Sequence, residues 1–167
     1  QPTPEAGLYQ RPPFRLVNPY GDSPVLLVCE HASRYIPEPL TQLGLDDAAA
    51  AEHIAWDIGA LELAEALAKR LDATLLVANY SRLLIDLNRP LSADDLIPEH
   101  SEVYPIPGNV GLSEANRQER VARLFEPFHQ QLTQLLDARI AEGREVRLVG
   151  VHSFTPSYRG KPRPWTA

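Results

Sequence analysis

Short, continuous runs of apolar residues alternate along this chain with longer segments of helical periodicity. Residues 25–29, 74–78 and 146–151 form such runs and are bounded by polar residues or proline. Runs of this length and composition are typical of strands buried on both faces of a sheet. A further run at 83–87 has the same character, although Asp86 interrupts it, and we expect a strand there as well.

Two longer segments carry apolar side chains three and four positions apart, as one face of a helix does. The first covers residues 46–71, where an aspartate can cap the first turn, and the second runs from Ser113 to Gly143. Pro127 must kink the second helix or start a new one. The order strand, helix, strand, strand, helix, strand favours an α/β fold in which helices cover a sheet.

Segments rich in proline flank and interrupt these elements. Residues 1–24 contain six prolines, so we expect an irregular arm that either lies over the domain or is mobile. Residues 88–112 are expected to form a long loop, and such loops inside a compact domain are usually functional or mobile. The tail at 157–167 is basic and has no core pattern, which leaves residues 25–156 as a single domain.

The chain of 167 residues is acidic, because 16 Lys and Arg against 22 Asp and Glu give a net charge of −6. Such a chain has no general electrostatic attraction for nucleic acid or an anionic membrane, so a small molecule is the expected partner. The lone cysteine, Cys29, excludes an internal disulfide framework and fits a reducing, cytoplasmic location. No apolar run approaches the roughly 18 residues that a membrane helix needs.

Polar side chains follow three of the predicted strands, at the edge where open α/β sheets bind ligands. They are Glu30 and His31 after the first strand, Asp86, Asn88 and Arg89 in and after the third, and His152 and Ser153 after the last. Either histidine alone is explained as a loop residue bonded to the backbone, whereas the pair at equivalent strand ends supports a shared site with equal weight. A zinc site would need a third ligand and an open position for water.

His53 and Asp57 are candidates for that third ligand, because residues four positions apart on the predicted helix share a face. The spacing alone favours the alternative, an exposed pair without a ligand role. Two other histidines are weaker candidates. We expect His100 to be solvated in the long polar loop, and we expect His129 to lie at the edge of the core.

Asp86 interrupts an apolar run, and a buried carboxylate without a partner is costly. We therefore expect it to pair with Arg82 or Arg89. Two interpretations of such a pair stay open. It is either a structural ion pair that orients the following loop, or a means of holding an arginine that binds a substrate carboxylate through two hydrogen bonds.

Four separate blocks of this sequence resemble the N-formylglutamate amidohydrolase family. They are VCEHAS at 28–33, HIAWDIGA at 53–60, SRLLIDLNRP at 81–90 and HSFTP at 152–156. Members of that family hydrolyse the formamide bond of N-formyl-L-glutamate in histidine degradation. The resemblance implies a phosphorylase/hydrolase-like, three-layer α/β/α sandwich with a mixed, mostly parallel sheet, similar to that of zinc carboxypeptidases.

The resemblance also implies roles for individual residues. His31 and His152 fall on metal-site positions, and Asp57 falls where one branch of the family carries a metal-site histidine, with His53 as the alternative. The expected cofactor is a divalent metal ion, with zinc as the first choice. The substrate-binding residues implied by the match are Arg82, Asn88, Arg89 and Ser153, and Asp86 is a candidate catalytic base.

The expected function is therefore metal-dependent hydrolysis of N-formyl-L-glutamate or a related N-acyl amino acid. The alternative is a non-catalytic domain that holds no metal and binds an acidic small molecule through the same arginines. Members of the family run longer than this chain, so we expect a C-terminally truncated chain whose main catalytic base lies beyond residue 167 and whose sheet has an uncovered edge.

Overall fold

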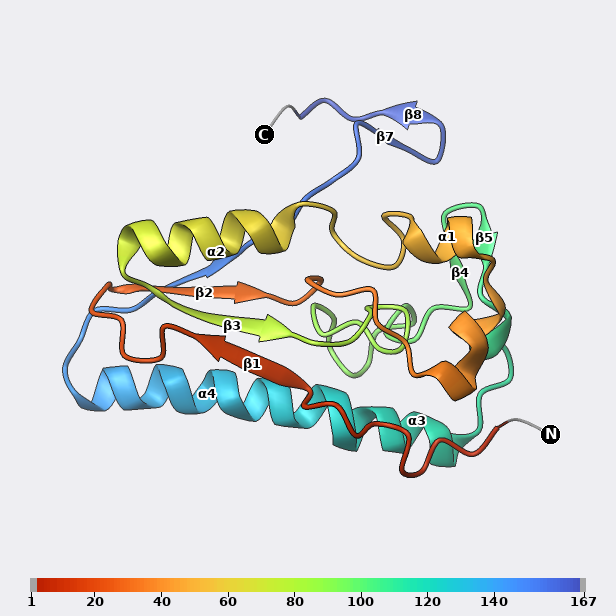
Figure 1. Ribbon diagram of the computed structural model, residues 1–167, viewed down its shortest axis with the longest axis horizontal. Helices are drawn as coiled ribbons and strands as arrows, with labels where there is room; N and C mark the ends of the chain where they lie inside the picture. The colour runs from red at the N-terminus through yellow and green to blue at the C-terminus, as the bar shows by residue number, and fades with distance from the viewer. Residues whose placement is uncertain (1–2, 166–167) are drawn as a thin grey trace.

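The computed structural model describes residues 3–165 and is built on a four-stranded sheet. The strands are β1 (Phe14–Val17), β3 (Thr74–Ala78), β2 (Val25–Cys29) and β6 (Arg147–Gly150), in this spatial order. β2 is parallel to both β3 and β6, whereas β1 is antiparallel to β3 (Figure 1). The parallel strands therefore end at a common edge, where the polar residues that follow β2 and β6 meet.

Helix α2 (Ala60–Leu71) covers one face of this sheet (Figure 1). Its buried positions are all alanine, which lets the helix backbone approach the strands closely; they are Ala60, Ala64 and Ala68. These alanines pack against the side chains that β2 and β3 direct to the same face, namely Leu27, Cys29, Leu75 and Val77. Cys29 is a buried free thiol within this layer.

The other face is covered by α3 (Glu114–Arg120), the π-helical turn η3 (Val121–Phe125) and α4 (Glu126–Ala141), which follow one another without a break (Figure 1). Pro127 lies at the start of α4, directly after the π-helical turn, so the helix changes its hydrogen-bond pattern at this proline and then continues. Leu124 and Phe128 of this layer pack on Val28 and Leu76. The expected α/β fold with a mixed sheet and helices on its faces is confirmed.

The helix expected over 46–71 is interrupted, and that expectation is wrong. The segment forms α1 (Asp47–Ala51) and α2, and residues 52–59 between them are turns. Tertiary hydrogen bonds hold this connection: the Asp57 amide donates to the His31 carbonyl at 2.9 Å, and Ser81 Oγ donates to the Ala55 carbonyl at 2.8 Å. His53 and Asp57 therefore do not share a helix face.

The strand expected at 83–87 is also absent, and this segment is a series of buried turns. Its apolar side chains are in the core, but its backbone groups form hydrogen bonds with a loop and with an arginine side chain in place of a neighbouring strand. The Asp86 amide donates to the Leu96 carbonyl at 2.8 Å, and the Leu84 carbonyl accepts from Arg120 at 2.9 Å. The apolar pattern thus predicted the burial of these side chains correctly, but it predicted their secondary structure incorrectly.

β6 differs from the expected strand buried on both faces, because all four of its residues are exposed. Within the described residues it pairs only with β2 and forms one edge of the sheet. Leu148 is 50% and Val149 is 40% exposed. An uncovered sheet edge was expected, and this strand is where it lies.

The proline-rich arm contributes more to the fold than an irregular segment would. It contains β1, an edge strand, which tolerates the prolines on either side of it. Glu5 and Arg120 form a fully buried ion pair, in which Arg120 Nε and Nη2 lie 2.8 and 2.7 Å from the two carboxylate oxygens. The arm is thereby fastened to α3.

Short elements complete the chain. They are the 3₁₀-helices η1 (Glu38–Gly44) and η2 (Pro107–Asn109), the hairpin of β4 (His100–Ser101) and β5 (Tyr104–Pro105), and the hairpin of β7 (Ser157–Tyr158) and β8 (Lys161–Pro162). The expected long loop and basic tail each contain one of these hairpins. Among the described residues, no helix has the length and apolar character to cross a membrane.

Candidate metal site

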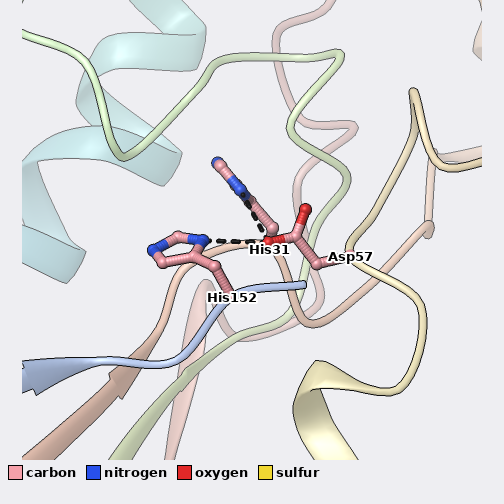
Figure 2. Close-up of side chains that lie close together, drawn as sticks. All are labelled: His31, Asp57 and His152. Atoms are coloured by element: carbon pink, nitrogen blue, oxygen red, sulfur yellow. Dashed lines mark hydrogen bonds and ion pairs between the residues drawn. The ribbon is translucent and has the colours of Figure 1, made fainter. Parts of the chain in front are cut away.

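Three side chains from distant parts of the chain converge at the carboxyl edge of the sheet (Figure 2). His31 follows β2, Asp57 lies in the connection before α2, and His152 follows β6. One potential ligand atom from each residue lies within 4.8 Å of the other two, and the two imidazole rings are 5.0 Å apart between centroids. Parallel pairing of β2 with β6 places the histidines side by side.

Asp57 links the two histidines. Its Oδ2 atom accepts a hydrogen bond from His152 Nδ1 at 2.9 Å and lies 3.4 Å from His31 Nδ1. The Ser153 amide donates to the same oxygen at 3.2 Å. Both histidines thus direct Nδ1 toward the carboxylate, and Nδ1 is the atom that each presents to the centre of the site.

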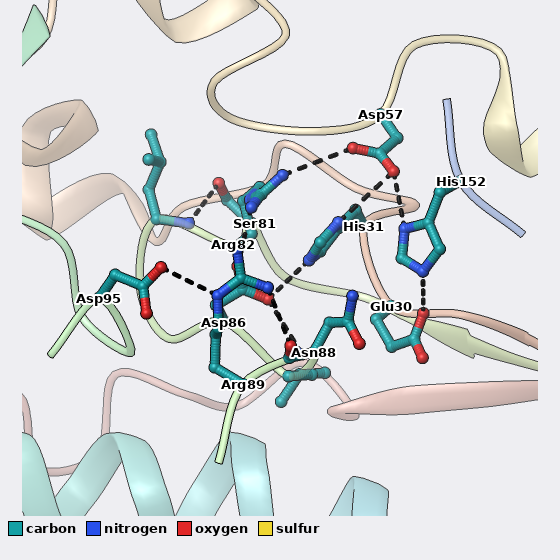
Figure 3. A network of polar contacts seen from close by, with 12 residues as sticks. Glu30, His31, Asp57, Ser81, Arg82, Asp86, Asn88, Arg89, Asp95 and His152 are labelled. Atoms are coloured by element: carbon teal, nitrogen blue, oxygen red, sulfur yellow. Dashed lines mark hydrogen bonds and ion pairs between the residues drawn. The ribbon is translucent and has the colours of Figure 1, made fainter. Parts of the chain in front are cut away.

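The outer ring nitrogen of each histidine, Nε2, lies next to a further carboxylate, and this carboxylate differs between the two histidines (Figure 3). His31 Nε2 lies 2.6 Å from Asp86 Oδ1, and His152 Nε2 lies 3.0 Å from Glu30 Oε2. A carboxylate can only accept, so Asp86 and Glu30 favour a proton on Nε2 of each ring. His152 Nδ1 also faces the Asp57 carboxylate, so without an ion this ring carries a proton on both nitrogens, and an ion bound at Nδ1 would take the place of one of them. Metal-binding histidines are usually oriented in this way.

The donor set fits a divalent metal ion. Two imidazole nitrogens and a carboxylate oxygen are ligands that zinc and related ions take in proteins. The Nδ1 atom of His31 is buried and has no hydrogen-bond partner, which is an unfavourable state for a ring nitrogen unless a cation or proton is placed there. His31, Asp57 and His152 are therefore the residues that could hold such an ion.

The charges of this cluster shift the pKa values of its members. Hydrogen bonds to Asp57 and Glu30 raise the pKa of His152 to about 9. Burial acts to raise the pKa of Asp57, but the hydrogen bonds and charges of the two histidines outweigh it and hold that pKa well below its usual range. Burial likewise acts to lower the pKa of His31, and the neighbouring carboxylates raise it instead.

Asp86 has every oxygen occupied. Oδ1 accepts from His31 and from the Asn88 amide at 2.9 Å, and Oδ2 accepts from Arg82 Nη2 at 2.8 Å. The expected pairing of Asp86 is therefore confirmed, with Arg82 as the partner, whereas Arg89 pairs with Asp95 at 2.9 Å. Burial acts to raise the pKa of Asp86, but His31 and Arg82 lower it to about 2.

A cavity of about 940 Å³ opens beside the three residues. Arg82, Asn88, Arg89 and Ser153 all line it, as do His53, His100 and part of the β7–β8 hairpin. Of the two arginines, Arg82 contacts the cluster, because its Nη1 atom is 3.6 Å from Asp57 Oδ1. The cavity is large enough for a small organic molecule and brings it next to both the triad and the arginines.

The remaining histidines take other places. His53 lies outside the triad and pairs with Glu102 at 3.0 Å, whereas His100 is exposed, as expected, and contributes to the wall of the cavity. His129 bonds the Leu87 carbonyl at 2.9 Å. Sequence reasoning assigned no role to Glu30 as the partner of His152; its position directly before His31 was the only available signal.

Residues 23–166 match the model of the family described as N-formylglutamate amidohydrolase. The chain belongs to the N-formylglutamate amidohydrolase family. It is similar to the crystal structure of gene product Atu2144 from Agrobacterium tumefaciens, with 42% identity and a TM-score of 0.89 over 92% of this chain and 61% of that one. It is also similar to N-formylglutamate amidohydrolase from Ralstonia eutropha JMP134, with 28% identity and a TM-score of 0.58 over 86% of this chain and 58% of that one.

The chain thus spans about three fifths of the length of these two solved structures. No curated protein matches it. The family assignment and the α/β fold agree with the resemblance found in the sequence blocks.

Proposed function

We propose that this chain carries the metal site of an amide hydrolase that cleaves N-formyl-L-glutamate or a related N-acyl amino acid. The observation that supports this most directly is the convergence of His31, Asp57 and His152 beside a cavity lined by arginines. Membership of the N-formylglutamate amidohydrolase family supports the same class of substrate. The proposed setting is histidine degradation in the cytoplasm.

His31 and His152 would hold the ion through Nδ1 and Asp57 through a carboxylate oxygen, and zinc is the ion that this set suits best. When bound, such an ion supplies Lewis-acid chemistry: it activates water and polarises an amide carbonyl. The protein's part is to keep the ligands in place. Asp86 and Glu30 do so by holding the outer nitrogens of the two histidines.

We propose Asp86 as a positioning residue in place of the catalytic base considered from the sequence. Both of its oxygens already accept hydrogen bonds, from His31, Arg82 and the Asn88 amide, so Asp86 is poorly placed to take a proton from water. The low pKa of Asp86 points the same way, because a base that works near neutral pH needs a pKa near that pH.

The arginines would bind and orient the substrate. Arg82 is fixed between Asp57 and Asp86, next to the metal ligands, where its guanidinium can donate to the amide oxygen as negative charge develops on it. Arg89 is held by Asp95 farther along the cavity wall and, with Asn88 and Ser153, is suited to a substrate carboxylate.

The test is metal content and formate release measured on the same preparations. The protein should purify with stoichiometric zinc, release formate from N-formyl-L-glutamate, lose activity to a chelator and regain it with zinc. His31→Ala and His152→Ala should lose the metal, whereas His129→Gln, on α4 outside the cavity, should keep it. A protein that binds N-formyl-L-glutamate but holds no metal and releases no formate would be a non-catalytic binding domain instead.

A further inference from the structure

Beyond His152 the chain forms the β7–β8 hairpin, which projects from the body of the domain (Figure 1) and lines the same cavity as the metal site. The hairpin turns through Arg159 and Gly160, both with positive φ, as a tight two-residue turn requires. The Arg163 amide donates to the Pro156 carbonyl at 2.8 Å and closes the base of the hairpin. Arg163 is thus tied to the segment that carries His152.

The guanidinium of Arg163 is surrounded by three aromatic rings. Its Cζ atom lies 4.9 Å from the ring centroid of Tyr158, 5.4 Å from that of Trp165 and 5.8 Å from that of Phe154. Phe154 and Trp165 also contact each other edge to face at 5.8 Å. Cation–π contacts of this kind hold an arginine in place without neutralising its charge.

The charge of Arg163 is uncompensated among the described residues. The other two cavity arginines are already paired, Arg82 with Asp57 and Asp86, and Arg89 with Asp95. No ion pair within residues 3–165 involves Arg163, and its Nε atom is buried without a hydrogen-bond partner. An oriented guanidinium with free donors is the group that recognises a carboxylate through two parallel hydrogen bonds.

We infer that Arg163 and its aromatic box form a second carboxylate-binding subsite, which selects substrates with an acidic side chain. The inference builds on the proposed function: Arg89 and Asn88 would take one carboxylate of an N-acyl amino acid, and Arg163 the other. A substrate with a neutral side chain would leave the Arg163 donors without an anionic partner, and sites built around such donors discriminate against it. Arg163 is therefore the residue that would set the preference for an N-acyl amino dicarboxylate over its analogue with a neutral side chain.

The experiment compares N-formyl-L-glutamate with N-formyl-L-glutamine, which has the same shape and a neutral side chain. In Arg163→Gln, kcat/KM for the glutamate compound should fall about 10- to 100-fold, mainly through KM, because a hydrogen bond to a charged group is lost. The kcat/KM of Arg163→Gln for N-formyl-L-glutamine should equal that of the parent. Arg163→Lys should recover part of the preference, and Arg147→Gln, at the opposite end of β6, should behave as the parent.

Binding is measured in parallel by calorimetry on metal-depleted protein with the same two compounds. If formate is released from neither compound, the proposed function fails, and the calorimetry still decides the subsite. Selective weakening of N-formyl-L-glutamate binding in Arg163→Gln supports the inference. Equal weakening of both compounds, no weakening of either, or a parent protein that does not prefer the glutamate compound overturns it.

Discussion

His31 Nε2 lies 2.6 Å from Asp86 Oδ1, and both side chains are almost completely buried. The contact joins the end of a central strand to a segment of buried turns, across 55 positions of sequence. It also connects Arg82, which bonds the other oxygen of Asp86, to His31 of the proposed metal site. Asp86 therefore links the proposed metal ligands to the arginine-containing segment that we propose binds the substrate.

Removal of the Asp86 carboxylate should be strongly destabilising. Asp86→Ala leaves Arg82 and His31 without their partner in a buried environment, so the free energy of unfolding should fall by about 3–5 kcal/mol. Denaturant unfolding of the parent and the variant measures this. Asp95→Ala, which removes an exposed partner of Arg89, is the matched control and should cost less than about 1 kcal/mol. Equal stability of Asp86→Ala and the parent would contradict the prediction.

Glu30 should act on metal affinity. Glu30→Gln keeps the size of the side chain but weakens its hold on His152 Nε2, and loss of such an outer partner typically costs 10–100-fold in affinity. Competition with a chromogenic zinc chelator gives the affinity directly. Glu145→Gln, exposed before β6, should bind zinc as the parent does. An unchanged affinity in Glu30→Gln would show that Glu30 does not position His152.

The buried pair between the arm and α3 should be needed for stability. Arg120→Leu leaves the Glu5 carboxylate uncompensated and removes the bond to the Leu84 carbonyl, so it should cost about 3–5 kcal/mol. Arg123→Leu, exposed on the next turn, should lie within about 0.5 kcal/mol of the parent. Hydrogen exchange adds a local readout, because amides of residues 83–86 should lose protection in Arg120→Leu. Unaltered protection there would mean that Arg120 does not support this segment.

The metal-free protein should become less stable as the pH rises from about 6.5 to about 9. The fold raises the pKa of His152 from its ordinary value of 6.5 to about 9, so its protonated form is favoured in the native state. The stabilisation is complete below about pH 6.5 and is lost as the pH rises through about 9. Urea unfolding of metal-depleted protein between these two values, compared with His152→Gln, isolates the effect. If the free energy of unfolding changes with pH in the same way in the parent and in His152→Gln, His152 does not cause the pH dependence.

Local sequence patterns predicted the central strands correctly and the connections poorly. β2 and β3 were found because a buried parallel strand needs apolar side chains on both faces, which gives a continuous run. The same signal misled at Leu83, Leu84 and Ile85, because a buried turn supported by distant hydrogen-bond partners has the same composition. The break before α2 was missed because the Asp57 amide is held by His31, which is distant in sequence.

What the sequence by itself determined is the fold class, and it made a shared site of His31 and His152 one of two equally weighted interpretations, because both residues directly follow predicted strands. It also carried the family resemblance. Only the tertiary structure decided that Asp57, and not His53, joins the histidines, that Glu30 and Asp86 contact their outer nitrogens, and that Arg163 lies among three aromatic rings. The reason is physical: periodicity reports which side chains are buried, whereas the partner of a buried charge is set by contacts between segments far apart in the chain.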